Sequence, residues 1–239
     1  MTTENTPVAR GGLFEDMIEV FYAPSAVFDR TRAVKAMKYV LATALIVLVI
    51  SVATKNLLMP WLDAQADLGI KMAEAKGKPM PDAAVSSMRS FTAWGIIIGA
   101  PLTMLIGPYL NALLIMLGAK ITKANISFSQ AATVATLAGM PRILGWLALP
   151  VQALLGNGES ARSLADLSLG PARLVDPLTT PPAVLTLLSN LDVFRIWQIA
   201  LVAIGVAVVA RVPKGTGAVI AIIMLGVGAI IQLLPSALF

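Results

Sequence analysis

The sequence predicts an all-α, polytopic membrane protein with five transmembrane helices and an N-terminal amphipathic interfacial helix. Of the 239 residues, 57% are hydrophobic and only 13% are charged, which leaves too little polar surface for a domain that faces water on all sides. Residues 191–211 show a complete span, with a polar collar, Trp197 one turn further in, a long apolar run and Arg211 at the end. About 20 helical residues cross a hydrocarbon layer of roughly 30 Å, and an interfacial Trp and a basic end are typical of such spans.

The composition also excludes most common enzyme chemistry. The chain has no Cys and no His, so it can form no disulfide, thiolate nucleophile, Ser-His-Asp triad or zinc site of the usual ligands. The formal net charge of +5 comes from Lys and Arg beside apolar runs, without an aromatic and basic surface for nucleic acid. We therefore expect no catalytic residue, no cofactor, no metal and no nucleic-acid partner, and the lipid bilayer as the surroundings.

The N-terminal region divides into two parts. Residues 1–12 are polar and are expected to form a flexible tail, and residues 13–38 form an amphipathic and then basic segment. In residues 13–22, apolar side chains fall on one side of a helix and acidic side chains on the other. This pattern fits a helix lying in the membrane interface and equally a helix packed against the end of the bundle.

Positive charge predicts the orientation in the membrane. The basic residues before the first span and in the short loops are Arg30, Arg32, Lys35, Lys38, Lys120, Lys123, Arg211 and Lys214. Lys and Arg accumulate in short loops on the cytoplasmic side. We therefore expect a cytoplasmic N-terminus and, with five spans, a C-terminus on the opposite, periplasmic side.

The transmembrane domain is expected to cover residues 39–239. Its spans are predicted at about 39–59, 88–117, 127–155, 192–211 and 215–234. Pro60 is expected to end the first span and to precede a short surface helix at 61–76, and Ser127 is expected to cap the third span. The Gly- and Pro-rich stretch 156–189 is expected to cover the outer face.

Prolines and small residues shape the predicted spans. A proline inside a span removes a backbone hydrogen bond and bends the helix, and the candidates for helix bending are Pro101, Pro108, Pro141 and Pro150. Small residues four apart let helices approach closely, and the candidates for helix packing are Gly95, Gly99, Ala135 and Gly139. The pair on the second span fits packing within the chain and also association of two copies.

Two polar residues within the spans form a candidate intramembrane polar site. Arg142 lies in an apolar run, where a guanidinium costs roughly 2.5 to 3.5 kcal/mol on insertion scales unless it is paired or faces water. Asn111 lies deep in the second span, close to the carbonyl that Pro108 leaves free. Both residues fit a structural hydrogen-bonding role, and both fit a functional polar cavity.

Several stretches resemble the YIP family, the Ypt/Rab-interacting-protein-like membrane proteins, in its bacterial branch. The segment 191–197 reads LDVFRIW, and the stretches 21–28 and 127–134 are also similar to the family. The signature residues are Asp192, Phe194, Trp197 and Gly205. The resemblance implies a five-helix bundle with a cytoplasmic N-terminus, here in a bacterial inner membrane. Eukaryotic members bind small GTPases through a longer N-terminal region than residues 1–38, so GTPase binding is not expected here.

Two function classes remain from the sequence. One is a non-catalytic membrane-organising or partner-binding subunit, with other membrane proteins or a second copy of the chain as candidate partners. The other is a translocator of lipid or small solute through a polar cavity near Arg142 and Asn111. A polar cavity at Arg142 would distinguish the second class from the first.

Overall fold

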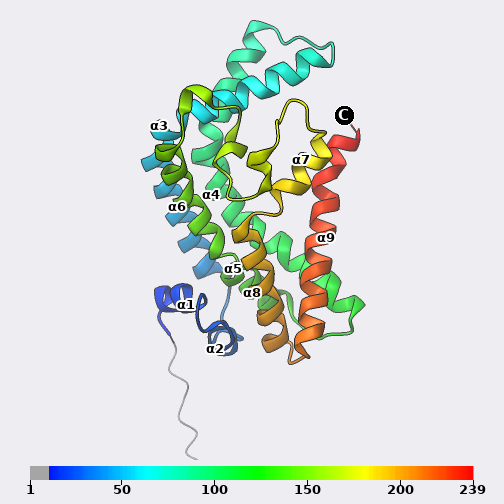
Figure 1. Cartoon of the computed structure of the whole chain (residues 1–239). Helices are drawn as coiled ribbons and strands as arrows, with labels where there is room; N and C mark the ends of the chain where they lie inside the picture. Colours follow the sequence, from blue (N-terminus) through cyan, green and yellow to red (C-terminus); the bar gives the residue numbers. More distant parts are fainter. Residues whose placement is uncertain (1–10, 239) are drawn as a thin grey trace, which may run out of the picture.

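The computed structural model describes residues 11–238, with side chains described as far as residue 234. This part of the chain contains helices and loops and no strand. Its helices are α1 (Leu13–Glu19), α2 (Pro24–Arg30), α3 (Met37–Ala75), α4 (Asp82–Ile121), α5 (Phe128–Ala138), α6 (Pro141–Leu155), the 3₁₀ turns η1 (Gly158–Ser160), η2 (Leu164–Leu167) and η3 (Pro171–Leu174), α7 (Pro182–Ser189), α8 (Val193–Val209) and α9 (Lys214–Leu238), arranged as in Figure 1. The flexible tail predicted for residues 1–12 lies outside the described residues except for its last two.

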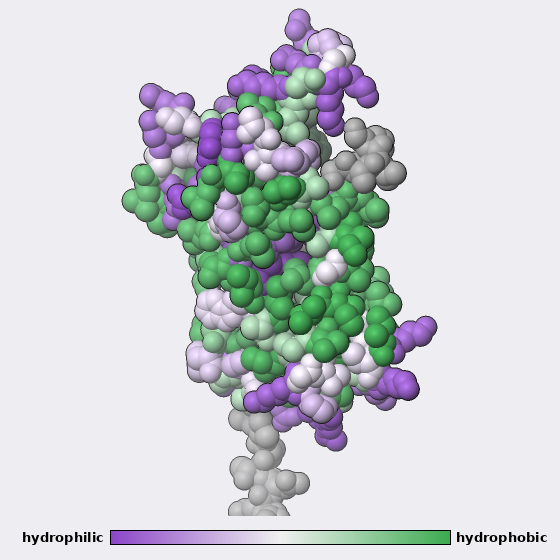
Figure 2. All heavy atoms as spheres, turned by 45° about the vertical axis from the view of Figure 1, so that its right-hand side comes forward, coloured by the Kyte–Doolittle hydropathy of each residue, from purple (hydrophilic) through white to green (hydrophobic). Residues whose placement is uncertain are grey.

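Four stretches are long and apolar enough to cross a membrane, namely α3, α4, Phe128–Leu155 and α9 from Lys214 to Leu234. Helices α7 and α8 meet at an angle of 61°. Counted together as one broken span, they form a fifth membrane-spanning stretch. Figure 2 shows a broad hydrophobic belt between two hydrophilic ends. The prediction of an all-α polytopic membrane protein is confirmed.

The first transmembrane helix is longer than predicted. The expectation that Pro60 ends it is wrong, because α3 continues through Pro60 to Ala75. A proline inside a helix forfeits one backbone hydrogen bond, and burial of its neighbours compensates, since Trp61 and Leu62 pack into a small core with residues of α6 and η2. With α4, the long α3 forms a hairpin that projects past the hydrophobic belt (Figures 1 and 2).

The third predicted span is divided between two helices. Helix α5 ends at Ala138 and α6 begins at Pro141, so Pro141 starts a helix instead of bending one. Proline is favourable at a first helical position because the N–H that it lacks would have no partner there. Ser127 caps α5 as predicted, since its hydroxyl accepts the Gln130 backbone N–H at 3.3 Å. Helix α5 is apolar and buried nearly all round, as expected for a helix at the centre of a bundle.

Close helix crossings occur at glycines outside the predicted set. A Cβ on Gly205 would lie 2.8 Å from the Val134 side chain and 2.9 Å from the Phe28 ring, so α8 touches α5 and α2 there. A Cβ on Gly118 would lie 3.1 Å from Ile220, where α4 crosses α9. These glycines let the backbones approach to distances that a side chain would prevent.

The predicted packing residues behave differently from one another. A Cβ on Gly95 or Gly99 would meet nothing within 4 Å, so this pair makes no close helix contact among the described residues. Ala135 is buried in the core, and Gly139 ends α5 with its Cβ position facing carbonyls of its own last turn. Association of two copies through the Gly95 and Gly99 pair stays a prediction.

Helices α1 and α2 lie together at one end of the bundle (Figure 1). Helix α1 turns Asp16 inward, where it is 2% exposed and meets Arg30 of α2 at 2.7 Å. On the other side of α1, Phe14, Ile18 and Tyr22 are exposed. The helix therefore combines the two arrangements that its sequence fits, since it packs against the bundle and also keeps an apolar strip on its outer side.

Candidate functional site

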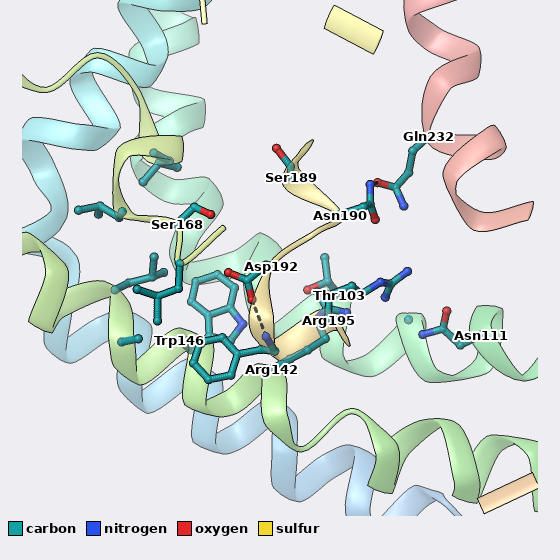
Figure 3. Close-up of a pocket in the computed structure, with 18 of the residues that line it drawn as sticks. Thr103, Asn111, Arg142, Trp146, Ser168, Ser189, Asn190, Asp192, Arg195 and Gln232 are labelled. Atoms are coloured by element: carbon teal, nitrogen blue, oxygen red, sulfur yellow. Dashed lines mark hydrogen bonds between the residues drawn. The ribbon is translucent and has the colours of Figure 1, made fainter. Parts of the chain in front are cut away.

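A cavity of about 590 Å³ lies in the half of the bundle away from α1 and α2. Its walls come from α4, α6, the η2 region, the junction of α7 with α8, and α9. The polar residues that line it are Thr103, Asn111, Arg142, Ser168, Ser189, Asn190, Asp192, Arg195 and Gln232 (Figure 3). A narrow pocket of about 20 Å³, called its extension below, adjoins it between α4, α5 and α6 and is also lined by Thr43 and Gln198.

Arg142 reaches the cavity from the first turn of α6 (Figure 3). Its guanidinium forms no hydrogen bond or ion pair with the part of the chain that the structure describes. The carboxylate that interacts with it electrostatically is that of Asp192. Asp192 already serves as the N-cap of α8, because its Oδ1 accepts the Phe194 backbone N–H at 2.8 Å.

A second guanidinium faces the same cavity. Arg195, in the first turn of α8, donates to the Gln198 side chain at 2.9 Å, and its Nε is buried with no partner among residues 11–234. Arg142 and Arg195 lie close enough to repel one another. Because Asp192 is the one carboxylate that residues 11–234 contribute to the cavity lining, the two arginines leave an excess of positive charge there. Like charges in a low-dielectric site are costly unless an anion joins them, and guanidinium groups bind carboxylates and phosphates well.

Asn111 lines both the cavity and its extension. Its side chain forms no hydrogen bond with another described residue, so the expected bond to the carbonyl freed by Pro108 is absent there. Within that region Asn111 and Arg142 line the same cavity, and a functional role for the pair stays a prediction. An unpaired amide offers a donor and an acceptor to a ligand.

The spans that border this space contain prolines. Pro101 and Pro108 lie inside α4 and Pro150 lies inside α6, where each removes one backbone hydrogen bond. Pro108 also lines the narrow extension of the cavity. Irregular backbone at membrane depth is tolerated where it borders protein or a polar cavity, which is its setting here.

A loop segment forms one wall of the cavity. Leu164 and Leu167 of η2 line it, and the Leu164 backbone N–H donates to the Gln65 side chain of α3 at 3.2 Å. Arg162 fastens the segment, since its guanidinium lies 2.5 Å from Asp166 Oδ1. Partial burial alone would raise the pKa of Asp166, but hydrogen bonds from Arg162 lower it below its usual value. The carboxylate is therefore charged at neutral pH, and the wall stays tied to itself and to α3.

Polar surface is visible from the membrane side. Figure 2 shows hydrophilic atoms in a hollow at mid-height of the hydrophobic belt. Two apolar residues that line the cavity are also exposed on the surface. The exposed fraction is 56% for Leu110 and 38% for Leu169. The cavity therefore reaches the side of the molecule that faces lipid.

Comparison with known proteins identifies the family. The family model of the Yip1 domain matches residues 18–234. The chain belongs to the Yip1-domain family. Neither a curated protein nor a solved structure matches it. The matched region includes α2 to α8 whole and most of α9, so the cavity lies entirely within the Yip1 domain.

The signature residues of the Yip1-like segment organise α8. Asp192 caps the helix, and the Phe194 ring packs on α6 where a Cβ on Gly145 would lie 3.1 Å from it. Trp197 meets the Phe21 ring edge to face with centroids 5.3 Å apart. With Gly205 at the crossing with α5 and α2, this segment joins the N-terminal helices, the centre of the bundle and the cavity wall.

Sequence reasoning found one of the two cavity arginines and missed the other. Arg195 lies in the polar collar at the start of the apolar run in residues 191–211, where a basic residue is typical of a span end. The available signal was its spacing, since Asp192, Arg195 and Gln198 recur every three residues and so share one face of α8. The meeting of that face with Arg142 depends on tertiary packing and has no local signal in the sequence.

Proposed function

We propose that this Yip1-domain protein binds an anionic ligand in the membrane-embedded cavity and moves or presents lipid or small solute there. The observation that carries the proposal is the convergence of two guanidinium groups on a polar cavity with one carboxylate, already engaged as a helix cap. Charges inside a membrane protein are expensive and commonly mark a functional path. Of the two function classes that the sequence leaves open, the cavity favours the translocator.

The proposal includes no catalytic step. The chain has no His or Cys, and the carboxylate in the cavity accepts a backbone N–H and interacts with the Arg142 guanidinium. A general base needs a free carboxylate or amine with a suitable pKa. Binding and release of an unchanged ligand are the chemistry that these residues support.

A membrane-organising role is the second candidate, and α1 is the observation that favours it. The exposed strip Phe14, Ile18 and Tyr22 is held at one end of the bundle by the buried Asp16. An apolar strip at that level would enter the lipid headgroup layer and act as a wedge. We place the protein in a bacterial inner membrane with its N-terminus in the cytoplasm, a placement supported by the basic loops at that end.

The test compares thermal stability with and without anionic probes. The wild type, Arg142→Met and Arg195→Met are purified in a neutral detergent and heated with phosphatidylglycerol, with glycerol phosphate, or with neither. Met is similar in length to Arg and needs no partner, so both variants should fold and even gain stability without a probe. We expect at least one probe to raise the Tm of the wild type, because a ligand that binds only the folded state stabilises it.

The Arg dependence of that shift decides the outcome. Loss of the shift in both Met variants supports an anion site in the cavity. An equal shift in all three proteins, or no shift with either probe, would overturn the proposal and leave Arg142 as a structural residue.

A further inference from the structure

Resting on the proposed function, we infer that the ligand is an anionic membrane phospholipid that is taken sideways from the bilayer. Its phosphate would lie against Arg142 and Arg195, and its acyl chains would stay outside the bundle. The inference names both the ligand class and the direction of access. It depends on where the cavity opens, what closes its other sides and what surrounds the opening.

The cavity opens within the hydrophobic belt. The hollow in Figure 2 lies between green surfaces above and below it, and hydrophilic atoms are visible inside. Gln232 of α9 lines the cavity and is exposed, as is Leu110 of α4. The opening therefore lies between these two helices and the loop segment that carries Leu169. A headgroup can pass such an opening without leaving the membrane.

Protein covers part of the cavity on the side away from α1 and α2. Leu164 and Leu167 form an apolar wall on that side, and Leu167 is buried. At the α7 end of the cavity, the Asn190 side chain donates to Gln232 Oε1 at 3.1 Å and to the Thr186 carbonyl at 2.9 Å, which ties α7 to α9. A soluble anion would have to pass beside this cover, where the exposed Ser189 also lines the cavity, whereas a lipid already lies at the side opening.

The rim of the opening suits acyl chains. Leu110 and Leu169 border the cavity and also face outward. Along the same outer face of α4, Leu102, Ile106 and Leu113 are exposed. Positive charge inside and apolar surface at the rim together match a molecule with an anionic head and a hydrocarbon tail. Phosphate oxygens match the fork of a guanidinium group and can accept hydrogen bonds from both arginines.

Gly107 gives the sharpest test because it lines the cavity and its extension from α4. A Cβ there would meet nothing within 4 Å, so Gly107→Leu fills the space without a clash at its first atom. Gly99→Leu is the matched control, because Gly99 lies on the same helix with equally open surroundings and does not line the cavity. Both variants add the same side chain to the same helix, so they differ in position alone.

The experiment measures retained lipid and thermal shift together. The wild type, the two Gly variants and Arg142→Met are titrated in neutral detergent with phosphatidylglycerol, with zwitterionic phosphatidylcholine and with glycerol phosphate, the soluble headgroup. Bound lipid is counted by native mass spectrometry, which does not depend on the stability of a variant. We expect phosphatidylglycerol to bind to the wild type and to Gly99→Leu with a shift of several degrees. Gly107→Leu should lose both signals, and phosphatidylcholine and glycerol phosphate should give much smaller ones.

Each outcome separates the inference from the proposed function. Glycerol phosphate that binds as well as the lipid, in an Arg142-dependent way, would overturn lateral lipid uptake while leaving the anion site intact. Phosphatidylglycerol that binds Gly107→Leu as well as the wild type would place the lipid outside the cavity and also overturn the inference. Failure of every probe to show an arginine-dependent signal would instead remove the proposed function itself.

Discussion

At the scale of single residues, a buried ion cluster fixes the N-terminal helices to the bundle. Arg30 lies 2.7 Å from Asp16 and 2.5 Å from Glu19, and the Tyr39 hydroxyl donates to Asp16. The hydrogen bond to Glu19, together with the interactions with Asp16, raises the pKa of Arg30 above its ordinary value against the opposing effect of burial. The guanidinium therefore stays charged, and Asp16 can be buried in α1 without an unpaired charge.

We expect Arg30→Met to destabilise the protein by about 3 kcal/mol, because it leaves two acidic groups without their partner. The Tm in neutral detergent should fall, and α1 should become sensitive to protease. Asp29→Asn is the matched control on the same helix, since Asp29 is 60% exposed and pairs with Arg32 near the surface. Its cost should stay below about 1 kcal/mol. Equal losses in the two variants would contradict a special role for the buried cluster.

At the scale of elements, the helices follow the sequence where a local signal exists. The Ser127 cap and the apolar run of α8 were predictable, because capping and hydrophobic patterning act within a few residues. The passage of α3 through Pro60 was not predictable, because burial of Trp61 against other elements decides it. The break after α5 has a signal in Pro141, but one proline fits both a bend and a helix start.

The glycine crossings show the same division between local and tertiary signals. The spacing of Gly95 and Gly99 is a known packing pattern, yet both face open space in the single chain. Gly205 has no such spacing partner in the predicted set and still holds the tightest contact among α2, α5 and α8. Sequence spacing indicates where helices can approach, and the packing of the whole bundle selects which sites are used.

We therefore expect Gly205→Ala to cost about 1 to 3 kcal/mol, because its Cβ would overlap Val134 and Phe28 in a packed core. Gly99→Ala should be neutral or slightly stabilising, since alanine favours a helix and the space is open. Thermal unfolding of both variants in the same detergent measures the difference. A neutral Gly205→Ala would show that α8 can shift away from α5, and the crossing would then not be a fixed contact.

At the scale of the whole molecule, polar and apolar surface are arranged as layers with one interruption. The hydrophobic belt and the two hydrophilic ends follow directly from the composition of the spans (Figure 2). The polar cavity interrupts the belt, and its residues come from five separate parts of the chain. Arg142 could be identified from sequence because a charge in an apolar run stands out, whereas its neighbours Arg195 and Asp192 required the fold. The layered plan is therefore readable from sequence, and the site within it only in part.

The orientation of these layers gives the last prediction. The turn between α3 and α4 and the loop before η2 lie at the end opposite α1 and α2 (Figure 1), so they should share the periplasmic side if the basic loops face the cytoplasm. The chain has no Cys, and single Cys variants at the exposed positions Ala75, Ser160 and Asn125 would therefore carry unique labels. In intact spheroplasts an impermeant thiol reagent should label Ala75→Cys and Ser160→Cys, whereas Asn125→Cys should react only after the membrane is opened. Labelling of Ala75→Cys without Ser160→Cys would mean that an odd number of spans, and not two, separates these loops. Labelling of Asn125→Cys alone would mean that the orientation of the protein in the membrane is the reverse of the one proposed.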